Sequence, residues 1–358
     1  MKLRNIIRRV HQYIIHHAHP VVYHTIGHKY PKYLGITTQQ ALEHLNSIHP
    51  DHGGSCLCSN NIRHDYDLHI IVPVYNVAPY VLQCLQSIVQ QITNYTVLVT
   101  IVNDGSTDDS AAIVHGFLRT MTEPTSSITL EFVQQTNQGP AIARNTALQD
   151  IRGRYLMFVD SDDMLMPNAI QSLMHAAMRH DADIAQGLSN RGSTHGFAWG
   201  KVIKSQHFST LCFPSGYWFE DTIIALFLYP LCHNIIHVKG LHYYYRYNTT
   251  SIMNTYQGNP KVLDSVWVSH RVLTDYFSAG HPATEALYHT FLEDALSTWH
   301  HLSTLQDESI LQSLFVLQRN IAQQYFSQYL TTSSPHQNVK HIHLALQTGN
   351  YRMVRCGM

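Results

Sequence analysis

The sequence predicts an α/β protein in which a mostly parallel sheet is flanked by helices and followed by a mainly helical C-terminal extension. Between residues 68 and 159, apolar segments of strand length alternate with segments whose apolar residues recur at helical spacing, a pattern typical of doubly wound sheets. Polar clusters directly follow several of the apolar segments, which is where such sheets bind ligands. Beyond about residue 256 the strand signals fade and helical spacing remains.

Four strands and three intervening helices are expected. The strands are the apolar runs 68–74, 96–102, 128–134 and 154–159. One helix follows Pro79, a second follows NDGSTDDS with Ser106 or Thr107 as its N-cap, and Pro140 begins the third. In the C-terminal extension, helical spacing covers residues 262–277, 283–302 and 310–330.

We divide the chain into a basic, His-rich N-terminal segment with a linker (1–66), an α/β domain (67–255) and the helical extension (256–358). The first 42 residues contain six Lys or Arg and no acidic residue. Within residues 1–20 the basic side chains, beside apolar residues at helical spacing, favour peripheral contact with anionic lipid, and a solvated or domain-packed helix fits equally well. These basic residues are Lys2, Arg4, Arg8 and Arg9.

The linker contains a group of His and Cys residues: His52, Cys56, Cys58 and His64. Their Cys-x-Cys spacing and irregular histidines lack the separation that structural zinc sites use. The Gly/Ser/Asn-rich segment around them is more simply a linker.

Composition excludes several classes of protein. The net charge is −1 and only 13% of residues are charged, and we expect no nucleic-acid partner. The six cysteines are scattered, which favours a reducing, cytoplasmic setting. No apolar run reaches the roughly 18–20 residues of a membrane span, and no secretory signal is evident. The glycine-rich loops of dinucleotide-binding and P-loop proteins are also missing.

Three carboxylates, Asp160, Asp162 and Asp163, follow the fourth expected strand. Carboxylates at the end of a buried strand repel one another and are costly to desolvate unless a cation compensates them. Oxygen ligands suit magnesium and manganese, which can hold a diphosphate and neutralise its charge as it leaves. The alternative is that these residues cap a helix beginning near Pro167.

Five segments, in this order, resemble the motifs of glycosyltransferase family 2: HIIVPVYNVAPY, VNDGSTDDS, NQGPAIARNTAL, GRYLMFVDSDD and FPSGYWFEDT. The resemblance covers about residues 68 to 250. It implies the GT-A nucleotide-sugar fold for the α/β domain and transfer of a sugar from a nucleotide diphospho-sugar.

The resemblance implies a nucleotide site. Pro73 and Tyr75 match the residues that line the base pocket, where a tyrosine ring can stack on the base. Asp104 matches the carboxylate that accepts a hydrogen bond from the ring N–H of uracil, and an Asx-turn role is compatible with this. Arg144 matches the arginine that faces the nucleotide and diphosphate, although an arginine on a helix is often a solvated charge.

The resemblance also implies the reacting groups. Asp160 matches the ribose or metal ligand, Asp162 matches the metal ligand, and Asp163 is expected to support them. Asp221 matches the catalytic base of an inverting transfer, with Glu220 orienting the acceptor or supporting the base. From local sequence alone, an acidic helix start is the better interpretation of Glu220 and Asp221, but their position about 60 residues after Asp162, within the matching PSGYWFEDT segment, favours the base.

Two later segments, AWGKVIK and HYYYRYNTTSIM, also resemble family segments. Their Lys201 and Arg246 are candidates for contacts with the diphosphate or the acceptor, and either could be only a surface charge.

We therefore expect an inverting enzyme, dependent on Mn or Mg, that moves a single hexose or N-acetylhexosamine, foremost from UDP, to a hydroxyl of a cell-surface glycan or lipid-linked acceptor. The glycan would be of the lipopolysaccharide, capsule or exopolysaccharide type. The missing QxxRW motif speaks against a processive synthase. The expected location is the cytoplasm, with peripheral contact at the inner face of the membrane through residues 1–20.

Two alternatives remain. A sugar-nucleotide pyrophosphorylase should carry a basic, Gly-rich loop after its first strand, and VPVYNVAPY has none. The second alternative is a GT-A-like protein that binds a nucleotide sugar or glycan without turnover.

Overall fold

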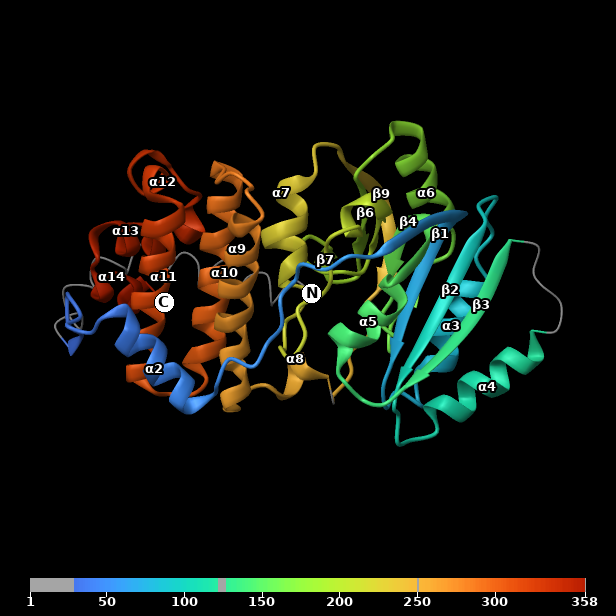
Figure 1. The fold of residues 1–358 in the computed structure, drawn as a ribbon, viewed down its shortest axis with the longest axis horizontal. Helices are drawn as coiled ribbons and strands as arrows, with labels where there is room; N and C mark the ends of the chain where they lie inside the picture. Colours follow the sequence, from blue (N-terminus) through green and yellow to red (C-terminus); the bar gives the residue numbers. More distant parts are fainter. Residues whose placement is uncertain (1–28, 122–126, 250, 358) are drawn as a thin grey trace, which may run out of the picture. The chain divides into compact units, whose positions relative to one another are not determined.

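The computed structural model describes residues 29–121, 127–249 and 251–357, and Figure 1 shows its ribbon. These residues divide into two compact units. One, the sheet unit, contains His52–Thr255 and Trp267–Gly280, and the other, the helical unit, contains the described residues up to Asp51, Tyr256–Val266 and those from His281 onwards. The basic helix expected within residues 1–20 lies outside the described residues.

The sheet unit is built on a mixed sheet. Among the described residues it has nine strands, in the order β3-β2-β1-β4-β8-β6-β9-β5, with β7 beside β6. The strands are β1 (Asn61–Val74), β2 (Val97–Asp104), β3 (Ile128–Gln135), β4 (Asp150–Phe158), β5 (Met164–Leu165), β6 (Ile184–Ser189), β7 (Gly192–Ser193), β8 (Lys201–Lys204) and β9 (Ile235–Tyr244).

The four strands that the sequence predicts form the parallel half of this sheet. Strands β2 and β4 both pair with β1 in parallel, since Leu68 lies opposite Val97 on one side and Tyr155 on the other. Strand β3 continues the parallel set beyond β2. Every residue of β2 is buried, which explains why its sequence is a continuous apolar run rather than an alternating one. The fold class is confirmed.

Helices cover both faces of the parallel strands. The four helices are α3 (Val81–Val89), α4 (Ser110–Thr120), α5 (Pro140–Leu148) and α6 (Ala169–His180). Apolar side chains of α3, α4 and α6 join alternate residues of β1, β2 and β4 in one buried cluster. Helix α5 contacts β1 and β2 as well, and its Leu148 is buried outside that cluster. The sheet therefore has a helix layer on each side, as the alternating pattern predicts.

Two predicted caps are wrong. Helix α4 begins at Ser110, after Asp109, and the hydroxyl groups of Ser106 and Thr107 instead donate to the side chains of Asn103 and Asn76. The alternative role of the acidic turn, Asp160 to Asp163, as a cap near Pro167 also fails. Strand β5 follows that turn directly, and α6 starts at Ala169 with Asn168 before it.

The C-terminal extension is helical, as expected. Its helices are α9 (Asp264–Ser278), α10 (Glu285–Ser303), α11 (Glu308–Tyr325), α12 (Ser327–Thr332), α13 (Lys340–Thr348) and α14 (Tyr351–Gly357), preceded by the short α8 (Ile252–Thr255). In the helical unit, α2 (Thr38–Ile48) packs on α11, where His44 and Ser313 share a hydrogen bond of 2.9 Å. Trp299 of α10 donates to Gln318 of α11 at 2.7 Å, so buried polar groups join these helices too.

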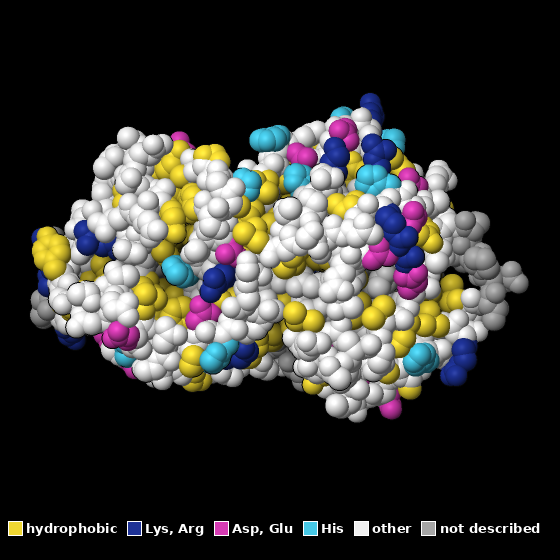
Figure 2. All heavy atoms as spheres, in the orientation of Figure 1, with side chains coloured by type: hydrophobic (Ala, Val, Ile, Leu, Met, Phe, Trp, Pro, Cys, Tyr) yellow, Lys and Arg dark blue, Asp and Glu magenta, His cyan; other side chains and the backbone are white. Residues whose placement is uncertain are grey.

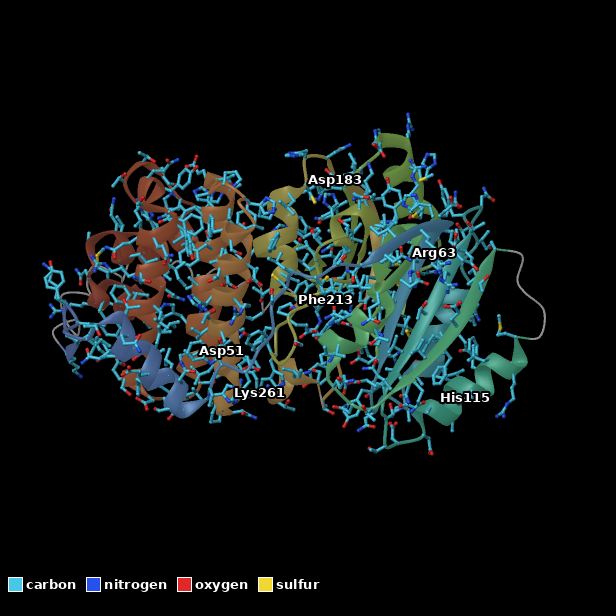
Figure 3. The ribbon with its side chains drawn as sticks, viewed as in Figure 1. Asp51, Arg63, His115, Asp183, Phe213 and Lys261 are labelled. Carbon is cyan, nitrogen blue, oxygen red and sulfur yellow. The ribbon has the colours of Figure 1, made fainter. Side chains whose placement is uncertain are left out.

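Charged side chains of both signs gather on the visible face of the sheet unit around Arg63 (Figures 2 and 3). Arg63 of β1 pairs with Asp150 of the neighbouring β4, and Arg152 of β4 pairs with Glu131 of β3. Exposed pairs of this kind contribute little to stability. None of the helices in the described residues combines the length and apolarity that a membrane crossing requires.

Candidate active site

The polar segments that follow β1 and β2 meet at one edge of the sheet. After β1, Asn76 adopts a left-handed backbone with φ 50°, and its side-chain oxygen accepts from the backbone N–H groups of Thr107 and Asp108 at 2.8 and 3.3 Å. Val77 N–H donates to the Ser110 hydroxyl at 2.8 Å. These bonds tie the two loops together beside Tyr75, whose side chain is 46% exposed. The arrangement leaves an aromatic ring accessible above a rigid turn.

Asp104, at the end of β2, is buried and holds the loop that leads into α5. Its Oδ1 accepts from the Gln135 side chain at 2.7 Å and from Gln138 N–H at 2.9 Å, and its Oδ2 accepts from Gly139 N–H at 2.8 Å. The Asx-type contact to the turn comes from Asn103 instead. The Asp104 carboxylate is thus fixed in position by groups from the third strand and the loop after it.

The acidic turn is held by strand β9 and the segment after it. The Tyr243 hydroxyl accepts from Asp160 N–H at 3.1 Å and donates to Asp163 Oδ2 at 2.8 Å. Arg246 N–H donates to Asp163 Oδ1 at 2.7 Å. Burial, followed by the charges of the other two aspartates of the turn, raises the pKa of Asp163 to about 8. Asp163 therefore joins the turn to the segment around Arg246.

Asp162 is anchored by the same segment. Its Oδ2 accepts from Asn248 Nδ2 at 2.9 Å, and its backbone carbonyl accepts from Arg246 Nε at 2.8 Å. Burial, followed by the charge of Asp160, raises the pKa of Asp162. A carboxylate whose ionisation is disfavoured by a neighbouring carboxylate fits a site for a hard cation with oxygen ligands.

Few protein side chains are available as ligands for such a cation. Among the described residues, no group of three or more His, Cys, Asp and Glu side chains forms a metal site. A metal held by Asp160 and Asp162 would thus take its remaining ligands from water and substrate, as magnesium commonly does.

Arg144 connects the acidic turn to Glu220. It lies on α5 and is buried, so the sequence alternative of a solvated charge is wrong. Its Nη2 donates to Asp160 Oδ1 at 2.8 Å and its Nη1 donates to Glu220 Oε1. Burial alone would lower the pKa of Arg144, but both carboxylates hold it above its ordinary value. The guanidinium carbon lies 5.2 Å from the centre of the Phe213 ring, which places this aromatic against the cation.

Phe213 is itself fixed to α5, near which it appears in Figure 3. Asn145 of that helix donates to the Phe213 carbonyl and accepts from its N–H, each at 2.8 Å. This paired contact orders the segment that leads to Glu220 and Asp221.

Glu220 and Asp221 follow a strained residue and precede a helix. Phe219 has φ 62°, a conformation that a bulky residue adopts only when its surroundings impose it. Ile224 N–H donates to the Asp221 carbonyl at 2.8 Å, at the start of the π-helix η3 (Ile224–Leu228). Asp221 thus does lie at a helix start, as the alternative had it, while Glu220 binds Arg144. π-Helical turns often occur at functional sites.

Burial gives Asp221 an unusual ionisation. Burial, followed by the charge of Glu220, raises the pKa of Asp221 to about 7, while Arg144 lowers it, Asp160 raises it and Lys201 lowers it. A carboxyl with a pKa near neutrality is matched to general-base work.

Lys201 and Arg246 occupy different surroundings. Lys201 is fully buried and donates to the backbone carbonyls of Thr194 and Phe197. Burial lowers the pKa of Lys201 to about 7, with Asp221 opposing. It is therefore not a surface charge. Arg246 lies over the Tyr80 ring at 5.1 Å and binds the acidic turn.

The structure thus brings Asp160 and Glu220 into direct contact with Arg144, and Asp162 and Asp221 follow these two residues closely in the chain. Pro73, Tyr75 and Asp104 lie at the carboxyl ends of β1 and β2, and within the described residues no hydrogen bond joins them to the acidic turn.

Sequence reasoning missed Tyr243 and Asn248. Both belong to a stretch rich in aromatic and polar residues, but their partners in the acidic turn lie about 80 residues away and are reached only because β9 pairs with β5.

The sequence pattern described as "Glycosyl transferase family 2" matches residues 69–237. Glycosyltransferase GlyA of Streptococcus pneumoniae is 29% identical over 301 residues, which cover 72% of this chain and 42% of GlyA. This chain thus spans less than half the length of that relative. The teichoic acid poly(glycerol phosphate) polymerase of Staphylococcus epidermidis is 39% identical over 118 residues, which cover 33% of this chain and 16% of the polymerase.

Two solved structures share the fold. TarS 1–349 of Staphylococcus aureus, in complex with UDP-GlcNAc, aligns with a TM-score of 0.59 at 17% identity and covers 81% of this chain and 89% of its own. The mannosyltransferase PcManGT of Pyrobaculum calidifontis, in complex with GDP-Man and Mn2+, aligns with a TM-score of 0.51 at 14% identity. The alignment covers 89% of this chain and 93% of PcManGT.

Proposed function

We infer that this chain belongs to glycosyl transferase family 2, whose pattern matches residues 69–237, and we propose that it is an inverting, metal-dependent enzyme that moves a single hexose or N-acetylhexosamine from a nucleotide diphospho-sugar to a hydroxyl group. The observation that carries this proposal is the position of Arg144. It joins Asp160 in the acidic turn to Glu220, the neighbour of Asp221. Arg144 therefore joins the expected donor end to the residue beside the expected base through two ion pairs.

In the proposed reaction Asp221 takes the proton of the acceptor hydroxyl while its oxygen attacks the anomeric carbon. The bond from that carbon to the diphosphate oxygen breaks on the opposite face, and the nucleoside diphosphate leaves with the bonding electrons. A base with a pKa of about 7 is about half ionised at neutral pH, and it accepts the proton without excessive cost. Glu220, held by Arg144, keeps the base segment in place.

The leaving diphosphate would meet unpaired N–H groups. Among the described residues, Arg144 Nε and Arg246 Nη2 are buried and have no hydrogen-bond partner. Buried donors without partners are costly, and an anion would satisfy them. Asp160 and Asp162 would hold the metal, Mn or Mg, which when bound neutralises charge on the diphosphate. Lys201 is buried and donates hydrogen bonds to the backbone carbonyls of Thr194 and Phe197. We therefore propose that it holds the loop of residues 194–197 in place and does not bind the diphosphate.

For the nucleotide we propose UDP, with Pro73, Tyr75 and Asp104 forming the base site. Asp104 Oδ2 accepts one hydrogen bond from the described residues, from Gly139 N–H. A carboxylate oxygen can accept two, so this atom retains capacity for a ring N–H such as that of uracil. TarS, which shares the fold, is in complex with UDP-GlcNAc, whereas PcManGT is in complex with GDP-Man.

For the acceptor we propose a hydroxyl of a cell-surface glycan or of a lipid-linked precursor. Similarity to a teichoic acid polymerase supports a cell-envelope role. We place the protein in the cytoplasm, with residues 1–20 contacting anionic lipid at the inner face of the membrane. Vesicle co-sedimentation that is unchanged by deleting residues 1–20 would refute that contact.

The deciding experiment is a donor-turnover screen with UDP, GDP and dTDP sugars, with Mn or Mg and with a chelator. We expect release of UDP that depends on the metal and is lost in Asp162→Ala and Asp221→Asn. Asp183→Asn serves as a control, because Asp183 lies in the same unit but binds His207 and has no hydrogen bond to Arg144 among the described residues. Full turnover in both site variants would refute the assignment. If the wild type binds a donor but does not turn it over, the alternative of a non-catalytic binding protein would be favoured.

A further inference from the structure

Three aromatic rings form a continuous stack in the sheet unit. Phe197 stacks on Trp199, and Trp199 stacks on Tyr243, with 4.6 Å between ring centres and 13° between ring planes in both pairs. Tyr243 and Trp199 are 0% and 4% exposed, whereas Phe197, at the outer end, is 39% exposed. The stack thus ends in a flat apolar ring that is open to solvent and supported from behind.

The inner end of the stack is attached to the acidic turn. The Tyr243 hydroxyl bonds to both Asp160 N–H and Asp163. Trp199 also forms a backbone bridge with Phe158, two residues before Asp160. The rings therefore keep a constant position relative to the proposed metal ligands.

The outer end is attached to the segment of the proposed base. Lys201 donates to the Phe197 carbonyl, and Asp221 is close enough to Lys201 to affect its ionisation. A side chain placed on Gly196, the residue before Phe197, would lie 3.9 Å from the Ala225 side chain on the helix after Asp221. Phe197 thus binds the ammonium whose pKa Asp221 influences, and the residue before it lies close to the helix that follows Asp221.

An exposed aromatic face attached to the segment that carries the proposed base is suited to a pyranose ring. Such a sugar presents a flat face of C–H groups that can cover the ring, while its hydroxyls point outward to polar partners. Because Phe197 is already stacked from one side, little side-chain freedom is lost on binding. An isolated hydrophobic surface residue would not need this support.

We propose that Phe197 is the stacking platform for the acceptor, that the acceptor is a pyranose, and that the platform presents its hydroxyl to Asp221. This inference rests on the proposed function. The donor is assigned to the diphosphate end at Asp160 and Asp162, so the ring on the Asp221 side serves the acceptor. A ring-free polyol phosphate acceptor would gain nothing from this face.

Saturation-transfer NMR with the whole chain tests the platform without turnover. The probes are methyl β-glucoside, methyl β-galactoside and methyl N-acetyl-β-glucosaminide, with glycerol 3-phosphate as the ring-free comparison. The variants are Phe197→Ala, Phe197→Leu, which keeps apolar volume without a flat face, and Phe197→Tyr, which keeps the ring. Ile92→Ala removes an 81% exposed apolar side chain after α3 and is the matched control.

We expect saturation of the ring C–H protons of at least one pyranoside by the wild type, by Phe197→Tyr and by Ile92→Ala, and about tenfold weaker binding in Phe197→Ala and Phe197→Leu. Equal binding by Phe197→Leu, binding of glycerol 3-phosphate alone, or no pyranoside binding by the wild type would overturn the proposal.

Donor hydrolysis, measured on the same samples, separates this inference from the proposed function. It should remain within about twofold of wild type in Phe197→Ala, because that ring does not touch the proposed donor groups. Hydrolysis lost in parallel with sugar binding would show a general disturbance of the site and would overturn the platform. Failure of the wild type to turn over any donor would instead count against the proposed function.

Discussion

Replacing Asp221 by asparagine isolates the charge of the proposed base, because the two side chains have nearly the same shape. Burial, followed by the charge of Glu220, raises the pKa of Asp221 from 3.8 to about 7. The ionised carboxylate is thus less favourable in the folded protein than in the unfolded chain. The stability that the protonated Asp221 carboxyl contributes is complete below pH 3.8, the unfolded pKa, and is lost as the pH rises through about 7, the folded pKa. The difference between these pKa values corresponds to about 4 kcal/mol as an upper figure.

We expect the free energy of unfolding of Asp221→Asn, relative to wild type, to increase by about 1–4 kcal/mol between pH 4 and pH 8. Urea unfolding followed by tryptophan fluorescence measures it at several pH values. Transfer by the variant at pH 8 should fall by about 10²–10⁴-fold. In the wild type, activity should rise with pH through about 7, as the base ionises.

The matched control is Asp183→Asn. Burial would raise the pKa of Asp183, but hydrogen bonds from the backbone N–H groups of Asn234 and His233 and from His207 outweigh burial and lower it. That carboxylate contributes stability above its unfolded pKa and loses it as pH falls, so the variant-to-wild-type difference should change in the opposite direction. A difference that does not vary with pH for Asp221→Asn, or that varies as in the control, would refute the electrostatic reasoning.

Three further changes test the geometry of the site. Arg144→Lys should lower transfer by at least about tenfold in a steady-state assay, because one ammonium cannot reproduce the two-pronged contact with both carboxylates; unchanged kcat would contradict the bridging role. Phe219→Gly should be more stable than Phe219→Ala by about 1 kcal/mol in urea unfolding, because φ 62° is strained for any residue with a Cβ; equal stabilities would mean that the backbone relaxes. Gly105 has φ 70°, and a Cβ added there would lie 2.7 Å from Asn137 N. Gly105→Ala should therefore lower the free energy of unfolding by about 1–3 kcal/mol and weaken UDP binding, as measured by calorimetry. An unchanged UDP affinity would argue against a rigid loop beside Asp104.

Much of the sheet could be predicted because buried parallel strands leave a strong local signal. Strands β1, β2 and β4 appear as apolar runs, since their central residues are buried within the sheet and its helix layers, whereas the edge strand β3 is recognisable although it is only partly buried. Strand β8 could not be found in this way. It has four residues with lysine at each end, and it runs antiparallel between β4 and β6. Its Lys201 becomes buried only because the carbonyls of a preceding loop accept its hydrogen bonds.

The acidic turn shows the same limit at the level of single residues. Its three aspartates are equivalent in local sequence, and Asp163 could not be given a defined contact from sequence. The folded chain distinguishes them: Asp163 binds Tyr243 and the backbone of Arg246, Asp162 binds Asn248, and only Asp160 reaches Arg144.

The sequence by itself determined the order of the four parallel strands and of the helices between them, the acidic residues available for chemistry and, through five ordered motifs, the resemblance to the family. These properties depend on periodicity and local residue type. Only the tertiary structure decided that Arg144 is a buried bridge rather than a solvated charge, and that Asp221 has a pKa near 7. Both depend on desolvation and on charges from residues distant in the chain, besides the adjacent Glu220 in the case of Asp221, and electrostatic energies vary with spatial distance and burial.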